Sequence, residues 1–174
     1  MALEEWEPRA DGFCAAQICR NGHVITTTAE LTAQHGGLEP HCPKCGEDTF
    51  VTCPKCHTPI KGRWPPDEHG LMDVPGFTFA HYCPTCGAAY PWTESKTAAA
   101  KELIAEMDGL TGEERALLSQ DLADLMRDTA RTDVAASRFK KLWIKAKGPA
   151  KDALGRLAMD LFTATAKGAV GLSP

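Results

Sequence analysis

The cysteines of this sequence occur in pairs at the spacing typical of metal ligands. Three pairs have C-x2-C spacing, and a fourth joins a cysteine to a histidine across three residues. The tight turn of such a pair lets both side chains reach one ion at about 2.3 Å. Eight ligands complete two tetrahedral sites, so we predict two structural Zn²⁺ ions. The predicted ligands are Cys19, His23, Cys42, Cys45, Cys53, Cys56, Cys83 and Cys86.

The four ligand pairs can be shared between two ions in three ways. Consecutive sites close loops of 18 and 26 residues, nested sites 7 and 59, and cross-braced sites 29 and 37. Loop-closure entropy separates the first two by only about 0.1 kcal/mol, and the third costs about 0.7 kcal/mol more. Strand-like runs decide instead, because Val24–Thr28 and Thr58–Trp64 leave ligand pairs and Gly76–Tyr82 enters one. We therefore favour two consecutive zinc ribbons, with the nested and cross-braced pairings as open alternatives.

The cysteine content also bears on the cellular compartment. The N-terminus is acidic and has no apolar run of the secretory type, and no apolar run approaches the roughly 20 residues that span a bilayer. We expect a cytoplasmic, reducing setting, in which paired cysteines bind metal rather than form disulfides. Cys14 has no further partner at metal spacing, and we expect it to be a free, buried thiol.

The chain changes character near Trp92. All eight cysteines and all six histidines precede residue 87, and helix-forming residues dominate after Trp92. A short strand is expected at Thr49–Thr52 in the first half, and a loop at Trp64–Pro75. We predict an α+β protein, with a double zinc-ribbon module at residues 1–93 and a bundle of three to four helices at residues 94–174.

The helix boundaries are predicted from capping residues. Thr93 or Ser95 can cap a first helix, and the T-x-x-E pattern of Thr111 and Glu114 is typical of a capping box for the second. Thr132 can cap a third helix, and a fourth can run from Pro149 to Gly168. In the third helix we expect Val134, Ala135, Phe139, Leu142 and Trp143 to point inward.

Charge in the second half is segregated. Residues 94–130 carry nine acids and four bases, whereas residues 131–167 carry nine bases and three acids. Either the two groups compensate each other, or a basic face binds an anionic partner such as nucleic acid, an acidic protein or a membrane surface. Exposed aromatic residues could extend a partner surface, although in so small a module they could equally fill the core. The candidate partner-binding residues are Trp64, Tyr90, Trp92, Arg138, Lys140, Lys141 and Lys145.

The same motifs resemble a bacterial family known as domain of unknown function 2321. The similarity covers nearly the whole chain. It implies a bacterial source and a zinc-ribbon module, and it implies no activity. The segments that carry it are Cys19-x-Asn-Gly-His23-Val, Cys42-x-x-Cys45-Gly, Cys53-Pro-x-Cys56 with Ile60-x-Gly62, Tyr82-Cys83-x-x-Cys86-Gly-x-x-Tyr90-Pro-Trp-Thr93, and Arg138-Phe-Lys-Lys141.

The pattern favours a binding protein over an enzyme. A catalytic zinc keeps one position open for water, whereas eight ligands close two sites, and no hydrolase, deaminase or P-loop motif is present. We expect a protein interaction or adaptor module without catalysis. Nucleic-acid binding through the basic helices is an alternative, although residues 1–93 hold eleven acids and six bases. A RING-like adaptor in protein modification is a second alternative, and it requires cross-braced sites.

Overall fold

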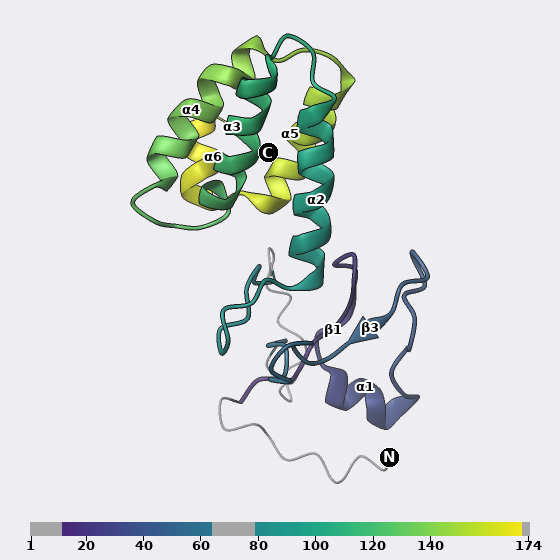
Figure 1. The fold of residues 1–174 in the computed structure, drawn as a ribbon. Helices are drawn as coiled ribbons and strands as arrows, with labels where there is room; N and C mark the ends of the chain where they lie inside the picture. Colours follow the sequence, from purple (N-terminus) through teal and green to yellow (C-terminus); the bar gives the residue numbers. More distant parts are fainter. Residues whose placement is uncertain (1–11, 64–78, 172–174) are drawn as a thin grey trace. The chain divides into compact units, whose positions relative to one another are not determined.

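The computed structural model describes residues 12–63 and 79–171. The chain divides into two compact units, with the boundary between Thr93 and Glu94 (Figure 1). Each unit is described by itself below. That residues 1–93 and 94–174 are separate domains stays a prediction.

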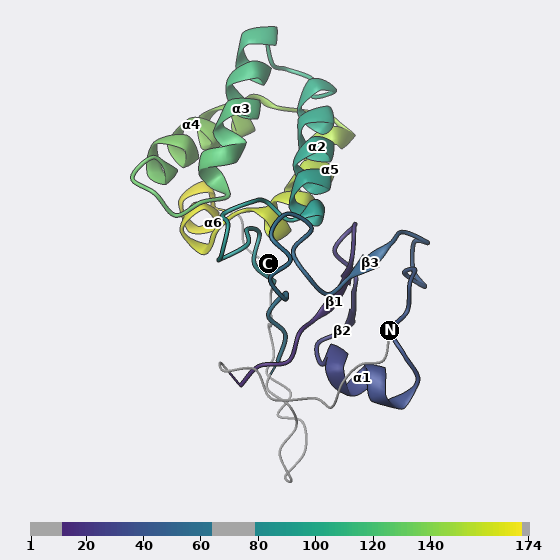
Figure 2. The same cartoon turned by 60° about the horizontal axis from the view of Figure 1, so that its bottom comes forward.

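A small antiparallel sheet lies at the centre of the first unit. Its strands are β1 (Gln17–Cys19), β2 (Val24–Thr26) and β3 (Thr49–Phe50), in the order β2-β1-β3. The central strand β1 is fully buried. A short helix, α1 (Ala29–His35), follows β2, and the cartoon seen from a second direction shows all three strands with α1 (Figure 2). The sheet places Cys19 at the end of its central strand.

The strands are shorter than predicted, and two elements were not predicted at all. The run Val24–Thr28 forms a strand only to Thr26, and Thr58–Trp64 contributes isolated bridges at Pro59 and Lys61. Of the run Gly76–Tyr82, residues 76–78 lie outside the described residues, as does the predicted loop Trp64–Pro75, and Tyr82 forms one bridge with Ala89. The two elements that were not predicted are β1 and α1. The sequence of β1 has no alternation of β-branched residues, and α1 is too short to show helical periodicity.

The backbone that follows the third ligand pair, at residues 60–62, passes close to the backbone at residues 14–16, just before β1. The N–H of Ala16 donates to the carbonyl of Ile60, and the N–H of Gly62 donates to that of Cys14, both at 2.8 Å. A Cβ atom on Gly62 would lie 2.1 Å from the carbonyl oxygen of Thr27. Only glycine fits there, so Gly62 allows the two ribbons to share one backbone crossing.

The second unit is a bundle of five helices around one hydrophobic core. They are α2 (Pro91–Ala105), which begins in the last residues of the first unit, α3 (Gly112–Leu125), α4 (Thr132–Lys145), α5 (Pro149–Leu161) and α6 (Ala164–Val170). Helix α4 packs on α3 and α6, and α2 runs beside α5 in both views (Figures 1 and 2). The buried side chains form a single cluster that includes Ile104, Leu118, Leu122, Phe139 and Leu154.

The caps explain where the structure agrees with the prediction and where it differs. Thr111 and Glu114 form the predicted capping box. Helix α2 begins earlier than predicted, at Pro91, because the hydroxyl of Thr93 donates to the carbonyl of His81 instead of capping a helix. The predicted fourth helix is two helices. It ends at Leu161, and the hydroxyl of Thr163 then caps α6, which gives five helices in place of three or four.

Helix α4 buries one face and exposes another. Ala135, Phe139 and Leu142 are buried as predicted, and Trp143 is partly buried and stacks on Phe139. The prediction that Val134 points inward is wrong, since 52% of this residue is exposed.

The acidic and basic segments of this unit compensate each other in part. Arg138 forms a two-pronged ion pair with Asp121, whose side chain is 1% exposed, and Lys145 binds Glu114 at 2.6 Å. The hydrogen bond from Lys145 lowers the pKa of Glu114, and the hydrogen bond to Asp121 raises the pKa of Arg138. These contacts join the acidic helix α3 to the basic helix α4.

We predict that the Arg138→Met substitution lowers the free energy of unfolding by about 3 kcal/mol, because it leaves the buried Asp121 carboxylate unpaired. Urea denaturation followed by circular dichroism measures this loss. The double variant Asp121→Asn with Arg138→Met should recover part of the stability. The matched control Lys145→Met breaks an exposed pair and should cost at most about 1 kcal/mol. Equal losses in the two single variants would contradict the assignment.

Candidate metal centres

The three C-x2-C pairs fold into the same turn. In each, the residue before the first cysteine bridges the residue three positions after the second, as in His41 with Asp48. The N–H of the residue that follows the second cysteine donates to the carbonyl of the first, at 2.8 to 2.9 Å. That residue has a positive φ, and it is Gly46 (76°), His57 (60°) or Gly87 (69°). The local sequence thus builds three zinc-knuckle turns, one of them with histidine in a conformation that favours glycine.

The fourth pair uses a turn of its own at the end of β1. The N–H of Cys19 donates to the carbonyl of His23 at 3.0 Å, and the N–H of Gly22 donates back to the carbonyl of Cys19 at 2.9 Å. Gly22 has a φ of 86°, and a Cβ atom there would lie 3.0 Å from the Cβ of Trp92. Glycine therefore serves both the turn and the close approach of the indole.

The first candidate centre brings together Cys19, His23, Cys42 and Cys45, whose ligand atoms all lie within 4.8 Å of one another. The Nδ1 atom of His23 lies 3.5 Å from the Cys19 sulfur and 3.6 Å from the Cys42 sulfur. The sulfurs of Cys19 and Cys45 are 3.8 Å apart. A tetrahedral zinc site has sulfur–sulfur edges of about 3.8 Å and sulfur–nitrogen edges of about 3.6 Å, so these donors fit such an ion.

The second candidate centre contains Cys53, Cys56, Cys83 and Cys86 at the same mutual spacing. Its recorded sulfur–sulfur distances are 3.9 Å between Cys53 and Cys86 and 3.6 Å between Cys56 and Cys83. Both values match a tetrahedral edge. The ligand pairs are therefore grouped consecutively, first with second and third with fourth. The cross-braced and nested groupings do not occur.

The electrostatics of the second centre call for a cation. Burial raises the pKa of the Cys83 thiol, but backbone hydrogen bonds from Cys86 and Thr85 and contacts with neighbouring sulfurs bring it down to about 6. A backbone hydrogen bond from Ala88 lowers the pKa of Cys86, yet burial and three neighbouring sulfurs raise it to about 11. Four thiolates this close repel one another, and a bound dication removes that penalty.

Several groups that contact the ligands were not identified from the sequence. The side-chain amide of Asn21 donates to the Cys45 sulfur at 3.5 Å, and the N–H of His23 donates to the Cys19 sulfur at 3.2 Å. The hydroxyl of Thr58 lies 3.3 Å from the Cys56 sulfur. Such contacts orient ligands and stabilise thiolates. Asn21 could have been considered from its position between Cys19 and His23, whereas no signal in the sequence distinguished Thr58.

Aromatic rings pack beside the second centre. Trp92 stacks on Tyr90 at 4.4 Å and on Phe50 at 5.9 Å between ring centroids, and the two tilts are 17° and 8°. Tyr90 and Trp92 are 2% and 4% exposed, and they belong to one buried cluster with Cys53 and Cys83. Burial and the nearby sulfurs raise the pKa of Tyr90. Both residues thus fill the core, which corrects their assignment to a partner-binding surface.

The remaining predicted partner-binding residues, apart from Trp64, lie on α4. Trp64 lies outside the described residues. Arg138 and Lys145 are held in ion pairs with α3, whereas Lys140 and Lys141 are exposed. Cys14 is fully buried and reduced, and it lies outside both ligand sets.

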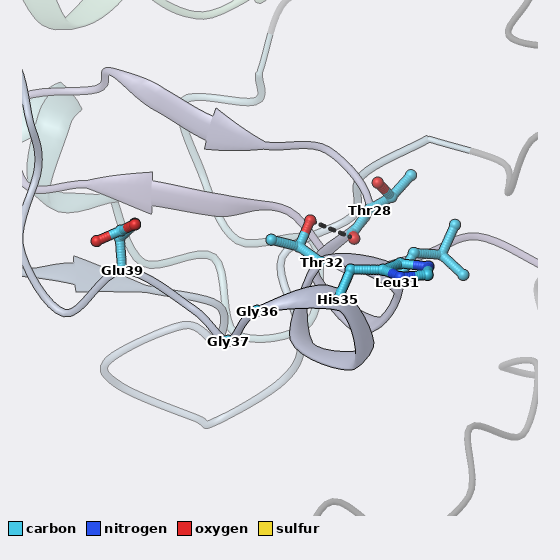
Figure 3. Close-up of a pocket in the computed structure, with 7 residues that line it drawn as sticks. All are labelled: Thr28, Leu31, Thr32, His35, Gly36, Gly37 and Glu39. Atoms are coloured by element: carbon cyan, nitrogen blue, oxygen red, sulfur yellow. Dashed lines mark hydrogen bonds between the residues drawn. The ribbon is translucent and has the colours of Figure 1, made fainter.

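A shallow pocket lies beside α1. Its volume is about 450 Å³, and Thr28, Leu31, Thr32 and His35 line one end of it, with Glu39 at the other (Figure 3). The hydroxyl of Thr32 donates to the carbonyl of Thr28 at 3.1 Å. No metal ligand lines this pocket, and we assign it no role.

Comparison with known proteins gives one match. A family model described as an uncharacterized protein conserved in bacteria (DUF2321) matches residues 13–170. A search of curated proteins finds no match, and neither does a search of solved structures. Among the described residues, no helix is both long and apolar enough to cross a membrane.

We predict that the protein binds two metal ions and that a limiting chelator removes the ion of the first centre first. Cys45 is exposed, and none of the four first-centre ligands belongs to the buried cluster that covers the second. Zinc release can be followed with a colorimetric chelator, and the occupied site with native mass spectrometry. The Cys45→Ser variant should bind only one ion, and it should release that ion no faster than the unaltered chain does. The Cys53→Ser variant should unfold in its first unit. Release of both ions in a single step would contradict this order.

We predict that His57→Gly stabilises the protein by about 1 kcal/mol, because glycine adopts a positive φ without steric cost. The matched substitutions Gly46→Ala and Gly87→Ala should destabilise by a similar amount. A Cβ atom at either glycine meets no other atom within 4 Å, so only the backbone conformation is tested. Thermal denaturation of the metal-loaded variants measures all three. A destabilised His57→Gly protein would show that the imidazole makes a stabilising contact.

Proposed function

The chain belongs to the DUF2321 family of bacterial proteins, and from this premise we propose that it is a zinc-stabilised adaptor that binds another protein. Both metal ions in this proposal are Zn²⁺ with a structural role. The main observation behind the proposal is that each centre has four protein ligands at tetrahedral spacing, which leaves no coordination position open. Thiolate-rich sets of four are typical of structural zinc.

The same observation supports a protein without catalysis at the metal. A catalytic zinc needs an open position for water or substrate, and each ligand set here already supplies four donors. When bound, the ion supplies a rigid link between two turns. The chain's own residues then orient the ligands, as Asn21 does at Cys45, and exclude water, as Tyr90 and Trp92 do beside the second centre.

The structure favours a protein partner over the alternatives. Arg138 and Lys145, two of the cations expected to contact phosphates, are engaged by Asp121 and Glu114. The metal-binding half carries more acids than bases, which disfavours a polyanion. The consecutive grouping of the ligand pairs lacks the cross-bracing on which the RING-like alternative depended.

The test expresses the tagged chain in a bacterium that encodes a family member and cross-links the cells before purification. We predict that the chain captures a defined protein and that nuclease treatment does not remove this protein. Capture that persists in the Cys53→Ser variant, whose first unit unfolds without its metal, assigns the partner to the helical unit. A gel shift on DNA and RNA at low salt serves as the control. Nuclease-sensitive capture, together with a salt-dependent shift, would replace the adaptor proposal with nucleic-acid binding.

A further inference from the structure

Helix α4 exposes a regular stripe of side chains, which we call the outer face of α4. It consists of Val134, Ser137, Lys141 and Ile144, spaced by three, four and three residues, with Lys140 at its edge. This spacing places the four side chains on one side of the helix. The opposite side, with Ala135, Phe139 and Leu142, packs into the core.

The ends of the outer face are apolar. Ile144 is 75% exposed and Val134 is 52% exposed. Of the large apolar side chains that the described residues expose, only Val24 lies elsewhere. Val134 and Ile144 are ten positions apart on the helix, which is about 15 Å or nearly three turns. Isolated exposed apolar residues are common, but two at the ends of one regular stripe are typical of a contact surface.

The middle of the outer face is positively charged. The neighbouring cations are neutralised within the unit, Arg138 by Asp121, Lys145 by Glu114 and Arg131 by Asp124. Lys140 and Lys141 are exposed, and no ion pair joins them to any part of the chain between residues 12–63 or 79–171. Asp121, Asp124 and Glu114 are therefore already paired, whereas Asp133, in the first turn of α4, is exposed and has no ion pair among the described residues. Lys140 and Lys141 lie seven and eight positions further along the helix, about 10 to 12 Å away, and their charges remain for a partner.

We propose that the outer face of α4 binds an acidic amphipathic helix of another protein. In this arrangement, apolar side chains of the partner cover Val134 and Ile144, and carboxylates lie opposite Lys140 and Lys141. The occupant is chosen by charge complementarity, and the stripe has the spacing with which one helix packs on another. The inference rests on the proposed adaptor role and names its surface and the class of its partner.

Other occupants fit this surface less well. Phosphates would leave Ile144 exposed, and two free lysines are few for binding a nucleic acid. On an anionic membrane, Lys141 would lie in the middle of the inserted face, between the two apolar residues. A second copy that packed α4 against α4 would bring the Lys140 and Lys141 side chains of both copies together, at a cost in repulsion.

The test uses two synthetic alanine-rich helical peptides of about 20 residues, long enough to be helical in isolation. One carries two leucines ten positions apart with glutamates between them, and the other has lysines in place of the glutamates. Binding to the metal-loaded full chain is measured by fluorescence anisotropy at low salt. We expect Ile144→Ser and the double variant Lys140→Glu with Lys141→Glu each to weaken binding of the acidic peptide about tenfold. The basic peptide should bind the double variant more tightly than it binds the unaltered chain.

The matched control is Lys101→Glu, an exposed lysine on α2, which should leave binding within twofold. Circular dichroism and metal content verify that each variant is folded. Equal binding by all variants, or no binding of the acidic peptide, would overturn the proposal. So would binding of anionic vesicles that the double variant abolishes, or a dimer that Ile144→Ser dissociates, because these outcomes identify a membrane or a second copy as the occupant. If the captured native partner binds Ile144→Ser as well as the unaltered chain, the adaptor role stands and this surface is wrong.

Discussion

The four ligand atoms of each metal centre must lie within one coordination sphere, and the rest of the first unit depends on this requirement. Its strands are only two or three residues long, and its buried cluster is small. Neither would be stable alone, since isolated hairpins and cores of this size are marginal in water. An ion bound at each site would supply the missing constraint, because it would join two tight turns that are separated by 18 or 26 residues of chain.

The two centres are connected by packing as well as by sequence. Phe50 lies in the segment between the second and third ligand pairs, and it stacks on Trp92, which in turn stacks on Tyr90 beside the second centre. The same indole lies against Gly22 in the first centre. A ring stack and the backbone crossing at Gly62 thus hold the two ribbons at fixed positions within the unit. Aromatic residues that looked available to a partner are instead needed between the metal sites.

The metal ligands were predictable because their signal is local. A knuckle is specified by residues within seven positions of one another, and the capping box at Thr111 and Glu114 is equally local. The grouping of the pairs was favoured only through flanking strands, which proved much shorter than expected. Burial was harder to predict, because it depends on contacts that are distant in sequence. The stripe of α4 did not reveal that Val134 is exposed, and nothing local indicated that Arg138 would be fixed by Asp121.

The consecutive grouping of the ligand pairs has a consequence for biosynthesis. The first centre is complete in sequence at Cys45 and its sheet at Phe50, before any ligand of the second centre has been translated. A ribosome adds on the order of 5–20 residues per second, so the first ribbon has seconds in which to acquire its ion before Cys83 and Cys86 emerge. Of the second centre, only the thiols of Cys53 and Cys56 are present during that time. A nested grouping would have left Cys19 and His23 waiting for the last pair, exposed to mispairing and oxidation in the nascent chain.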